Sequence, residues 1–408
     1  MLKINNIIKE LDLKDFNCQV FVDKNLSNQA IELINKLGNY KNKVFISDKK
    51  IFDNCKIFFE ENFLENFSNV ILLENPKADD TTISKISEKL GKCDLIVALG
   101  SGTINDLCKY ISFNSVTDYI IFASAPSMNG YLSKTSSLIL NGHKKTISTK
   151  VANAVFCDLN ILKSSPAEMV KAGIGDSLCF YSCWFDWLLS HLLIETDFNS
   201  KCFEIVNERI AFLIENYKNF NIKDEALLKL LIEILLLSGI AMSLSKGSYP
   251  ASQSEHLIAH VFEMKYPHKA QEILHGLQIA TATLTSLEIQ EELINQDSVF
   301  LRDYSYPEQK ISNFFSPIIA SECKSEYLIK YNIIKSGHKF IKNELENNWQ
   351  SYVGALSRIV MSKELLKEIF WHFKIDFGYK YLGLTYQEYQ ELVSFAKFIR
   401  RRYTCLDL

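Results

Sequence analysis

The stretch LIVALGSGTINDLCKY, residues 95–110, joins a run of five apolar residues to two glycines and then to a segment with helical spacing of its apolar residues. An apolar run of this length that ends in Gly-Ser-Gly and continues as an amphipathic segment predicts a buried strand leading directly into a helix. The two glycines, Gly100 and Gly102, raise the question of what the bare backbone accommodates at this turn.

The same alternation of strand and helix extends over about the first 160 residues. β-type runs such as NKVFISD (42–48) and DYIIFAS (118–124) alternate with helical patterns such as NQAIELINKLGNY (28–40). Repeated strand–helix units predict a parallel sheet that helices cover on both faces. We therefore expect a Rossmann-like α/β domain over residues 1–163, with a small antiparallel hairpin that turns at Asn141-Gly142.

From Pro166 onward the pattern changes to long helical segments, which predict an all-α domain over residues 164–408. The most apolar window, LLKLLIEILLLSGIAMSL (227–244), contains Lys229 and Glu233. Charged side chains are costly in lipid, so we expect a buried helix and no membrane span.

The charge balance and the cysteine content indicate which cellular compartment and which classes of binding partner to expect. The 45 basic and 48 acidic residues give a formal net charge of −3, which does not favour nucleic-acid binding. The ten cysteines are scattered without CxxC pairs, as is typical of reduced thiols. The first residues lack an apolar h-region and a cleavage site, so we expect a cytoplasmic protein without a signal peptide.

The turn at residues 100–102 is a candidate nucleotide site. N–H groups at a helix N-terminus favour an anion, and glycines let a phosphate approach closely. A tight turn without a ligand explains the pattern equally well, because it is shorter than GxGxxG. A second small-residue loop, ASAPSMNGYLS (123–133), is expected at the same sheet edge. Asp48 closes a third strand, where it is either a ribose acceptor or a solvated turn residue. The expected nucleotide-binding residues are Asp48, Gly100, Ser101, Gly102, Thr103, Asp106, Ser124 and Ser127.

Three motifs in the helical half carry metal-ligating side chains. They are AGIGDSL with Asp176, SEHLIAH with His256 and His260, and LHGLQIA with His275. A carboxylate and two imidazoles suit Zn²⁺, Fe²⁺ or Ni²⁺ and leave a position for a substrate oxygen. His256 and His260 lie one helical turn apart, so either both bind one metal or one of them orients the other. A single histidine in a protein is more often a core or surface residue than a metal ligand. The metal-site hypothesis therefore rests on the occurrence of these motifs together with the glycine loop at residues 100–102.

In this order, the motifs resemble those of the sn-glycerol-1-phosphate dehydrogenases, within the iron-containing alcohol dehydrogenase and dehydroquinate-synthase-like superfamily. The resemblance is carried by GSGTINDLCKY, APSMNGYLSKTSSLILNGHKKT, CDLNIL, AGIGDSL with FDW, PASQSEHLIAHVFEM, LHGLQIATATL and IRRRYTCLDL. Residues 1–94 agree with the family in pattern only. The resemblance implies a dehydroquinate-synthase-like fold, with a dinucleotide-binding domain, a helical domain and a cleft that holds one divalent metal on Asp176, His256 and His275.

The resemblance also implies a reaction, the NAD- or NADP-dependent interconversion of dihydroxyacetone phosphate and sn-glycerol 1-phosphate. Zinc is the expected metal, with nickel or iron as alternatives, and the chain is expected to form a homo-oligomer. Asp176 favours a dehydrogenase over a cyclase, because the dehydroquinate synthases have glutamate there. The metal would polarise the substrate carbonyl while nicotinamide supplies hydride. His260 is the candidate catalytic proton relay, with an orienting role as the alternative.

Several positions depart from the family pattern. Asn129 replaces an aspartate, Phe180 a lysine and Tyr249 an arginine, and Gln253 stands for a glycine. Loss of two cations predicts weak phosphate recognition unless Lys134, Lys144 or Lys145 compensates. The expected substrate-contacting residues are Asn129, Ser133, Phe180 and Tyr249. The alternatives are a related metal- and NAD-dependent enzyme on a different polyol, phosphonate or carbocycle-forming substrate, and a non-catalytic binding protein.

Overall fold

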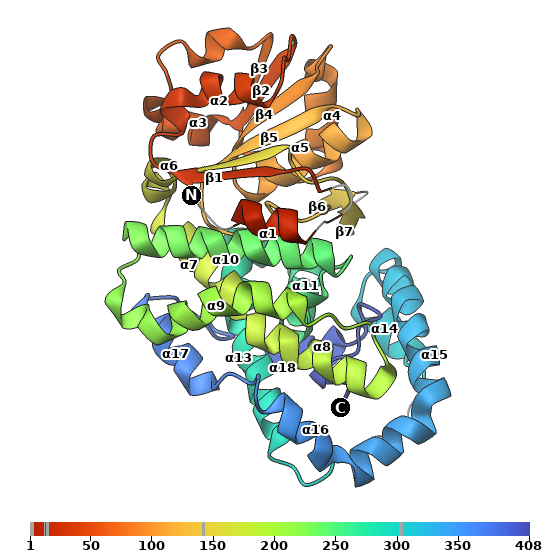
Figure 1. Ribbon diagram of the computed structural model, residues 1–408. Coiled ribbons are helices and arrows are strands. Elements are labelled where there is room, and N and C mark those ends of the chain that lie inside the picture. Colours follow the sequence, from red (N-terminus) through yellow and green to blue (C-terminus); the bar gives the residue numbers. More distant parts are fainter. Residues whose placement is uncertain (1–3, 12, 14–15, 141–142, 302–304) are drawn as a thin grey trace. The chain divides into compact units, whose positions relative to one another are not determined.

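The computed structural model describes residues 4–11, 13, 16–140, 143–301 and 305–408 (Figure 1). The chain divides into two compact units. The first unit comprises residues 1–177 and 205–244, and the second comprises residues 178–204 and 245–408. This grouping differs from the expected division after residue 163, because helices that follow the α/β pattern in sequence pack with it.

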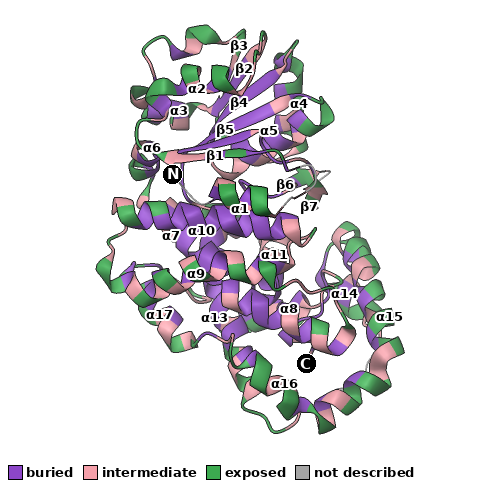
Figure 2. Ribbon diagram, viewed as in Figure 1, coloured by how far each residue is buried: buried purple, intermediate pink, exposed green. Residues whose placement is uncertain are grey.

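The first unit is built on a six-stranded sheet with the strand order β1-β8-β5-β4-β2-β3. Every pair of neighbouring strands is parallel, as the alternating pattern predicts. The strands are β1 (Gln19–Asp23), β2 (Lys43–Asp48), β3 (Asn69–Leu73), β4 (Leu95–Gly100), β5 (Asp118–Ala123) and β8 (Ala154–Asp158). All six residues of β4 are buried, because helices cover both faces of a parallel sheet (Figure 2).

Helices of the first unit lie on both faces of this sheet (Figure 1). One face packs against α2 (Ala30–Leu37), α3 (Lys49–Cys55) and α6 (Leu159–Ser164), and the other against α4 (Asp80–Leu90) and α5 (Gly102–Asn114). The unit also contains α1 (Ile4–Glu10), α7 (Ala167–Leu178), the later part of α9 (Lys201–Asn216) and α10 (Glu225–Leu244). The α/β architecture inferred from the sequence is therefore confirmed.

A small antiparallel ribbon projects from the first unit. Its strands are β6 (Thr135–Leu140) and β7 (His143–Ser148), and they pair antiparallel in register from Thr135 with Ser148 to Leu140 with His143. The expected hairpin is confirmed by this pairing, although its turn residues 141–142 lie outside the described part of the chain.

The second unit is helical over its described residues. Its helices are α8 (Phe180–Ile194), the first residues of α9, α11 (Ser254–Lys265), α12 (Pro267–Glu272), α13 (His275–Ile294), α14 (Glu308–Phe314), α15 (Pro317–Asn347), α16 (Trp349–Leu356), α17 (Lys363–His372) and α18 (Tyr386–Ala396). The C-terminal segment is anchored by Lys330 of α15, which is fully buried and pairs with Asp407 at 2.8 Å. Lys330 also donates to the carbonyls of Lys397 and Arg402.

Two helical stretches among the described residues, Ala167–Ile194 and Glu225–Leu244, are long and apolar enough to cross a membrane. In each, most of the apolar window is buried inside the protein, 72% and 83% respectively. Burial of this kind is typical of the core helices of a folded protein, and α10 carries Glu233 in an ion pair with Arg209 at 2.9 Å.

Candidate active site

The turn between β4 and α5 contains two glycines, Gly100 and Gly102, and an added Cβ atom would meet different surroundings at each. A Cβ atom on Gly100 would lie 2.4 Å from Cβ of Ile104, so this position requires glycine for the tight entry into the helix. A Cβ atom on Gly102 would meet only Cγ of Met128, at 3.5 Å, an ordinary contact. Gly100 therefore serves packing, whereas packing within the described residues does not require glycine at position 102.

The first turn of α5 presents its N–H groups at this position. Ser101 is the N-cap residue, and among the described residues its side chain accepts no capping hydrogen bond. Ser101, Gly102 and Thr103 are all half-buried. A half-buried helix N-terminus at which packing does not require the glycine fits the phosphates of a nucleotide.

Three strand ends meet at this edge of the sheet. Ser47 of β2 pairs with Leu99 of β4, and Gly100 pairs with Ala123 of β5. The Ser124 N–H donates to the Gly100 carbonyl at 2.9 Å, which holds the second loop against the glycine turn. Ser127 is half-buried further along that loop. The expected convergence of the two loops is therefore observed within the first unit.

Two expected nucleotide-binding carboxylates already have partners within the protein. Asp48 caps α3 by accepting from the Lys50 N–H at 2.7 Å. Asp106 accepts from Ser137 N–H at 3.1 Å and from the Asn105 side chain at 3.1 Å. Burial raises the pKa of Asp106, against the lowering effect of Lys109. The contacts give both residues structural roles, and their roles in nucleotide binding stay predictions.

Gly102→Val is expected to weaken NAD(P)H binding about tenfold or more, because the added methyl groups would occupy space at the helix N-terminus. The fold should survive, since only an ordinary contact with Met128 is created. Fluorescence titration of NADH and NADPH measures the affinity, and thermal unfolding measures the fold. Unchanged affinity in a folded variant would mean that the residue only makes a turn.

The loop after β5, residues 124–133, is held between two helices by close backbone contacts. On α7, a Cβ atom at Gly173 would lie 1.8 Å from the Pro126 carbonyl oxygen. On α10, a Cβ atom at Gly239 would lie 3.0 Å from the Asn129 carbonyl oxygen. Only glycine allows both helices to approach the loop this closely.

This loop also contacts Asp176 near the end of α7. The Asn129 N–H donates to Oδ2 of Asp176 at 3.0 Å, and Asp176 is 3% exposed. Asp176 belongs to the first unit, whereas all the candidate histidines belong to the second. Its role as a metal ligand therefore stays a prediction.

Lys109 fixes the same loop, and the sequence analysis missed it. This lysine of α5 is fully buried and donates to the carbonyls of Gly130, Ser133 and Thr135 at 2.7, 3.1 and 3.0 Å. It also donates to the Ser133 hydroxyl at 3.3 Å, so the expected substrate residue Ser133 is buried in this network. Burial lowers the pKa of Lys109 to about 8. The available signal was a lysine on the apolar face of an expected helix.

The structure brings His256, His260 and His275 together in the second unit. The centroids of the His256 and His275 rings are 5.4 Å apart, and His260 lies 6.0 and 5.9 Å from them. His256 and His260 project from one face of α11, and His275 is the first residue of α13. His256 is buried, whereas the other two are half-buried. Such a cluster of imidazoles fits a borderline divalent metal.

Two glutamates that sequence reasoning missed orient these histidines. Nδ1 of His256 lies 2.8 Å from Oε1 of Glu255, and Nδ1 of His275 lies 3.2 Å from Oε1 of Glu263. A carboxylate only accepts, so in each pair the Nδ1–H donates to it, which leaves Nε2 as the nitrogen that could bind a metal. For Glu263 the available signal was its helical spacing, because it lies seven residues after His256 on α11. Its partner His275 comes from α13, which that spacing does not indicate.

Glu255 is fully buried and accepts from several donors. Besides His256, it accepts from Gln253 N–H at 2.7 Å, Ser182 Oγ at 2.8 Å and Cys183 Sγ at 3.1 Å. Burial alone would raise its pKa, but the hydrogen bond and charge of His256 outweigh this effect and lower it to about 2.

Glu255→Gln is expected to lower metal affinity at the histidine site about 10- to 100-fold, because the amide keeps the size but loses the charge that holds the His256 tautomer. Competition with a chromophoric chelator measures the affinity. Glu272→Gln, at an exposed position of α12, is the control and should behave as wild type. Equal affinity in both variants would contradict the orienting role.

Asp186 of the FDW motif fixes the start of α11. This buried carboxylate accepts from Ser254 N–H at 3.1 Å and from Cys405 N–H at 2.8 Å. Burial raises its pKa to about 7. Asp186 thus joins two segments, the N-terminus of α11, which carries His256, and the C-terminal segment at Cys405.

Phe180 and Tyr249, the aromatic residues at positions where the family pattern has cations, lie in one cluster of aromatic rings in the second unit. Phe180 is 3% exposed and stacks on Phe203 at 5.1 Å between centroids. Tyr249 stacks on Trp187 at 5.9 Å and is half-buried. Burial among rings gives Phe180 a packing role, and substrate contact by either residue stays a prediction.

A cation from the C-terminal segment lies on the Tyr249 ring. Cζ of Arg402 is 5.1 Å from the ring centroid, and its guanidinium donates to Ser252 Oγ at 2.8 Å and to the Ser248 hydroxyl. Arg402 therefore places a guanidinium beside residue 249, the position at which the family pattern has an arginine. The sequence alone did not indicate this, since 153 residues separate the two positions (402 minus 249).

Comparisons with known proteins agree with this description. Residues 21–166 match the iron-containing alcohol dehydrogenase family. The chain is similar to the glycerol-1-phosphate dehydrogenase (NAD(P)+) of Bacillus subtilis (strain 168), with 36% identity over 207 residues, 50% of this chain and 52% of that protein. It is 31% identical over 213 residues to the enzyme of the same name from Geobacillus stearothermophilus, with 52% and 53% covered. The chain thus spans about half the length of the curated relatives it matches.

Solved structures agree on the fold. A probable glycerol dehydrogenase from Sinorhizobium meliloti 1021 superposes with a TM-score of 0.62 at 15% identity, covering 94% of this chain and 90% of that chain. The expected dehydroquinate-synthase-like fold is confirmed. The resemblance inferred from the motifs is confirmed as well: the chain is similar to the glycerol-1-phosphate dehydrogenases over about half of its length, and its residues 21–166 match the iron-containing alcohol dehydrogenase family.

Proposed function

We propose that the chain is an NAD(P)-dependent, metal-dependent dehydrogenase that interconverts dihydroxyacetone phosphate and sn-glycerol 1-phosphate. The observation that carries the proposal is the pair of histidines, His256 and His275, whose Nδ1 atoms each face a glutamate. Surface histidines seldom have this arrangement, whereas metal-ligating histidines almost always do. The names of the relatives support the substrate.

The residues fit one divalent metal. His256 and His275 would hold it, with Asp176 as the third ligand that the family resemblance implies. Zinc is the first expectation, with nickel or iron as alternatives, because imidazole and carboxylate suit all three. When bound, the metal would polarise the substrate carbonyl, and the nicotinamide nucleotide would supply the hydride.

The protein's own groups supply binding, orientation and the proton. Glu255 and Glu263 hold the tautomers of the two ligand histidines. His260 is half-buried and lies beside both, so an imidazole nitrogen of His260 is our candidate to deliver the proton to the alcohol oxygen. Gly102 and the first turn of α5 would hold the nucleotide phosphates.

Arg402 supports a phosphorylated substrate. The loss of a cation at Tyr249 predicted weak phosphate recognition, but the guanidinium of Arg402 lies on that ring. Its bonds to Ser248 and Ser252 fix its position. An arginine held in this way is pre-organised for an anion, since little side-chain entropy remains to be lost.

Arg402→Gln is expected to lower kcat/KM for dihydroxyacetone phosphate about 10- to 100-fold, the effect of losing a charge-assisted hydrogen bond of about 1.5–3 kcal/mol. The value for unphosphorylated dihydroxyacetone should change much less. Arg402→Lys should lie between, because it keeps the charge and loses the planar fork. Arg401→Gln, at the exposed neighbouring position, is the control. Equal losses on both substrates would remove Arg402 from phosphate recognition.

Net oxidation of NADH or NADPH by dihydroxyacetone phosphate tests the function itself. A dehydrogenase consumes one equivalent of nucleotide per turnover, whereas a carbocycle-forming enzyme regenerates it and a binding protein turns nothing over. Absence of net oxidation with zinc, nickel and iron would reject the proposal.

We also propose that the chain forms a homo-oligomer and is located in the cytoplasm. Size-exclusion chromatography with light scattering measures the oligomeric state.

A further inference from the structure

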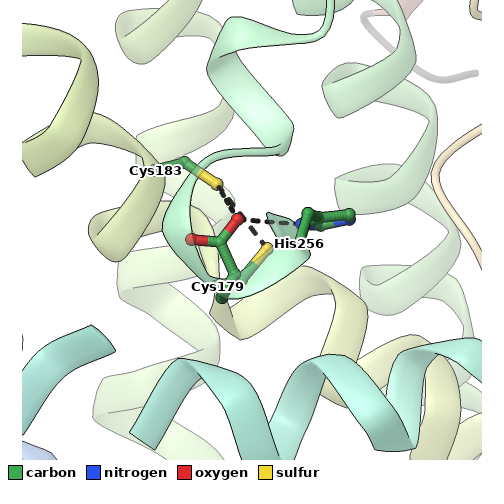
Figure 3. A group of neighbouring side chains, drawn as sticks. Cys179, Cys183 and His256 are labelled. Atoms are coloured by element: carbon green, nitrogen blue, oxygen red, sulfur yellow. Dashed lines mark hydrogen bonds and ion pairs between the residues drawn. The ribbon is translucent and has the colours of Figure 1, made fainter. Parts of the chain in front are cut away.

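A second group of metal-ligating side chains lies within the second unit. Cys179 and Cys183 of α8 and the neighbouring Glu255 and His256 of α11 place one ligand atom each within 4.8 Å of one another. All four residues are buried. Figure 3 shows the side chains of Cys179, Cys183 and His256 turned toward a common point.

The spacing of the two cysteines brings both thiols to one side of a helical turn. Cys179 immediately precedes α8 with helical backbone angles, and the Cys183 N–H donates to the Cys179 carbonyl at 2.9 Å. The two sulfur atoms are 3.9 Å apart. A tetrahedral ion with metal–sulfur bonds of about 2.3 Å places its two sulfurs about 3.8 Å apart, so the pair already has the required separation.

The remaining two ligand atoms lie next to the thiols. Oε1 of Glu255 is 3.1 Å from Cys183 Sγ and 2.8 Å from Nδ1 of His256. The other carboxylate oxygen, Oε2, is held by the Ser182 hydroxyl at 2.8 Å, which keeps Oε1 directed at the cluster. Ligand atoms of a tetrahedral site with bonds near 2.0–2.3 Å are about 3.3–3.8 Å apart. Oε1 of Glu255 is closer than this to Cys183 Sγ and to His256 Nδ1, so the carboxylate has to move away from both atoms to admit an ion.

We propose that Cys179, Cys183, Glu255 and His256 form a binding site for a thiophilic divalent ion, zinc or cadmium, distinct from the candidate catalytic site. Two sulfurs, one imidazole nitrogen and one carboxylate oxygen are a ligand set that selects such ions over magnesium or calcium. Apolar side chains of Ala259 and Ile279 pack against the cysteines and exclude competing water ligands. The ion would take Nδ1 of His256, and its binding would release to solvent the Nδ1 proton and the protons of the two thiols. The catalytic metal would take Nε2.

The shared histidine links the two sites, but each has ligands of its own. His275 belongs only to the candidate catalytic site, and Cys179 and Cys183 belong only to this thiolate site. The two proposals can therefore fail separately. An ion in the thiolate site would also replace the hydrogen bond between Glu255 and His256. The ion would then orient the His256 ring in place of Glu255, an effect on the catalytic histidine that rests on the proposed function.

The test is titration of the metal-free full chain with Cd²⁺, followed by the ultraviolet thiolate-to-cadmium charge-transfer band. Wild type is expected to develop the band with one equivalent at an amplitude of two thiolates. Cys179→Ser with Cys183→Ser should lose the band and bind Cd²⁺ at least about 100-fold more weakly at this site. Cys179→Ala, a smaller change that removes one thiol, should keep about half of the amplitude.

Two controls make the result specific. Cys202→Ser with Cys323→Ser removes two buried cysteines outside the cluster and should leave the band unchanged. His275→Ala should also keep the band, whatever its effect on activity. The proposal is overturned if wild type shows no thiolate band at stoichiometric Cd²⁺, or if the control pair loses it as the Cys179 and Cys183 pair does.

Discussion

His275→Ala is expected to remove one metal ion per chain and to lower dehydrogenase activity roughly 10³-fold or more. The substitution deletes one of two imidazoles whose Nδ1 atoms are held by carboxylates, and with it a Lewis acid worth about 4 kcal/mol or more of transition-state stabilisation. Elemental analysis measures the metal, and nucleotide oxidation with dihydroxyacetone phosphate measures the rate.

The fold should be retained in this variant. His275 is half-buried and begins α13, where alanine is an equally good helix former. His268→Ala, at an exposed position of α12 in the same unit, is the matched control and should keep both metal and activity. Full metal content together with full activity in His275→Ala would remove the site assignment.

Gly173→Ala is expected to lower the free energy of unfolding by about 3 kcal/mol or more. Its Cβ would lie 1.8 Å from the Pro126 carbonyl oxygen and 2.9 Å from the carbonyl carbon. Both are backbone atoms, so either α7 or the loop of residues 124–133 must move, which exceeds the usual cost of overpacking a core. The gain of about 1 kcal/mol from alanine in a helix does not offset this clash.

Urea denaturation followed by circular dichroism measures the effect. Gly354→Ala is the matched control, because it also lies in a helix, α16, and its added Cβ meets no described heavy atom within 4 Å. We expect the control to be stabilised by about 0.5–1 kcal/mol. Equal stabilities of the two variants would refute the close contact between α7 and the loop.

Local sequence patterns were sufficient for the architecture of the first unit. The apolar run at residues 95–100 and the helical spacing after Gly102 predict β4 and α5, because burial on both faces and helical periodicity are both visible in neighbouring residues. The ribbon of β6 and β7 was predicted on the same basis. Motif order was sufficient for the family resemblance and for His256, His260 and His275.

Patterns of neighbouring residues did not predict which helices and strands pack together into each compact unit. Helix α10 reads as part of a helical half, yet it belongs to the first unit, where Gly239 contacts the Asn129 carbonyl. A helical pattern shows which face is apolar and does not show which element that face packs against.

The sequence by itself determined the fold class, the glycine turn and the histidines, because each depends on the period or chemistry of residues close together in the chain. Only the tertiary structure decided that a Cβ at Gly102 would meet just Met128, in an ordinary contact, and that Arg402 lies on Tyr249. It also decided which carboxylates face the histidines and which thiols face Glu255. Except for the neighbours Glu255 and His256, these pairings join different segments of the chain, and their geometry is set by the packing of helices that no local pattern records.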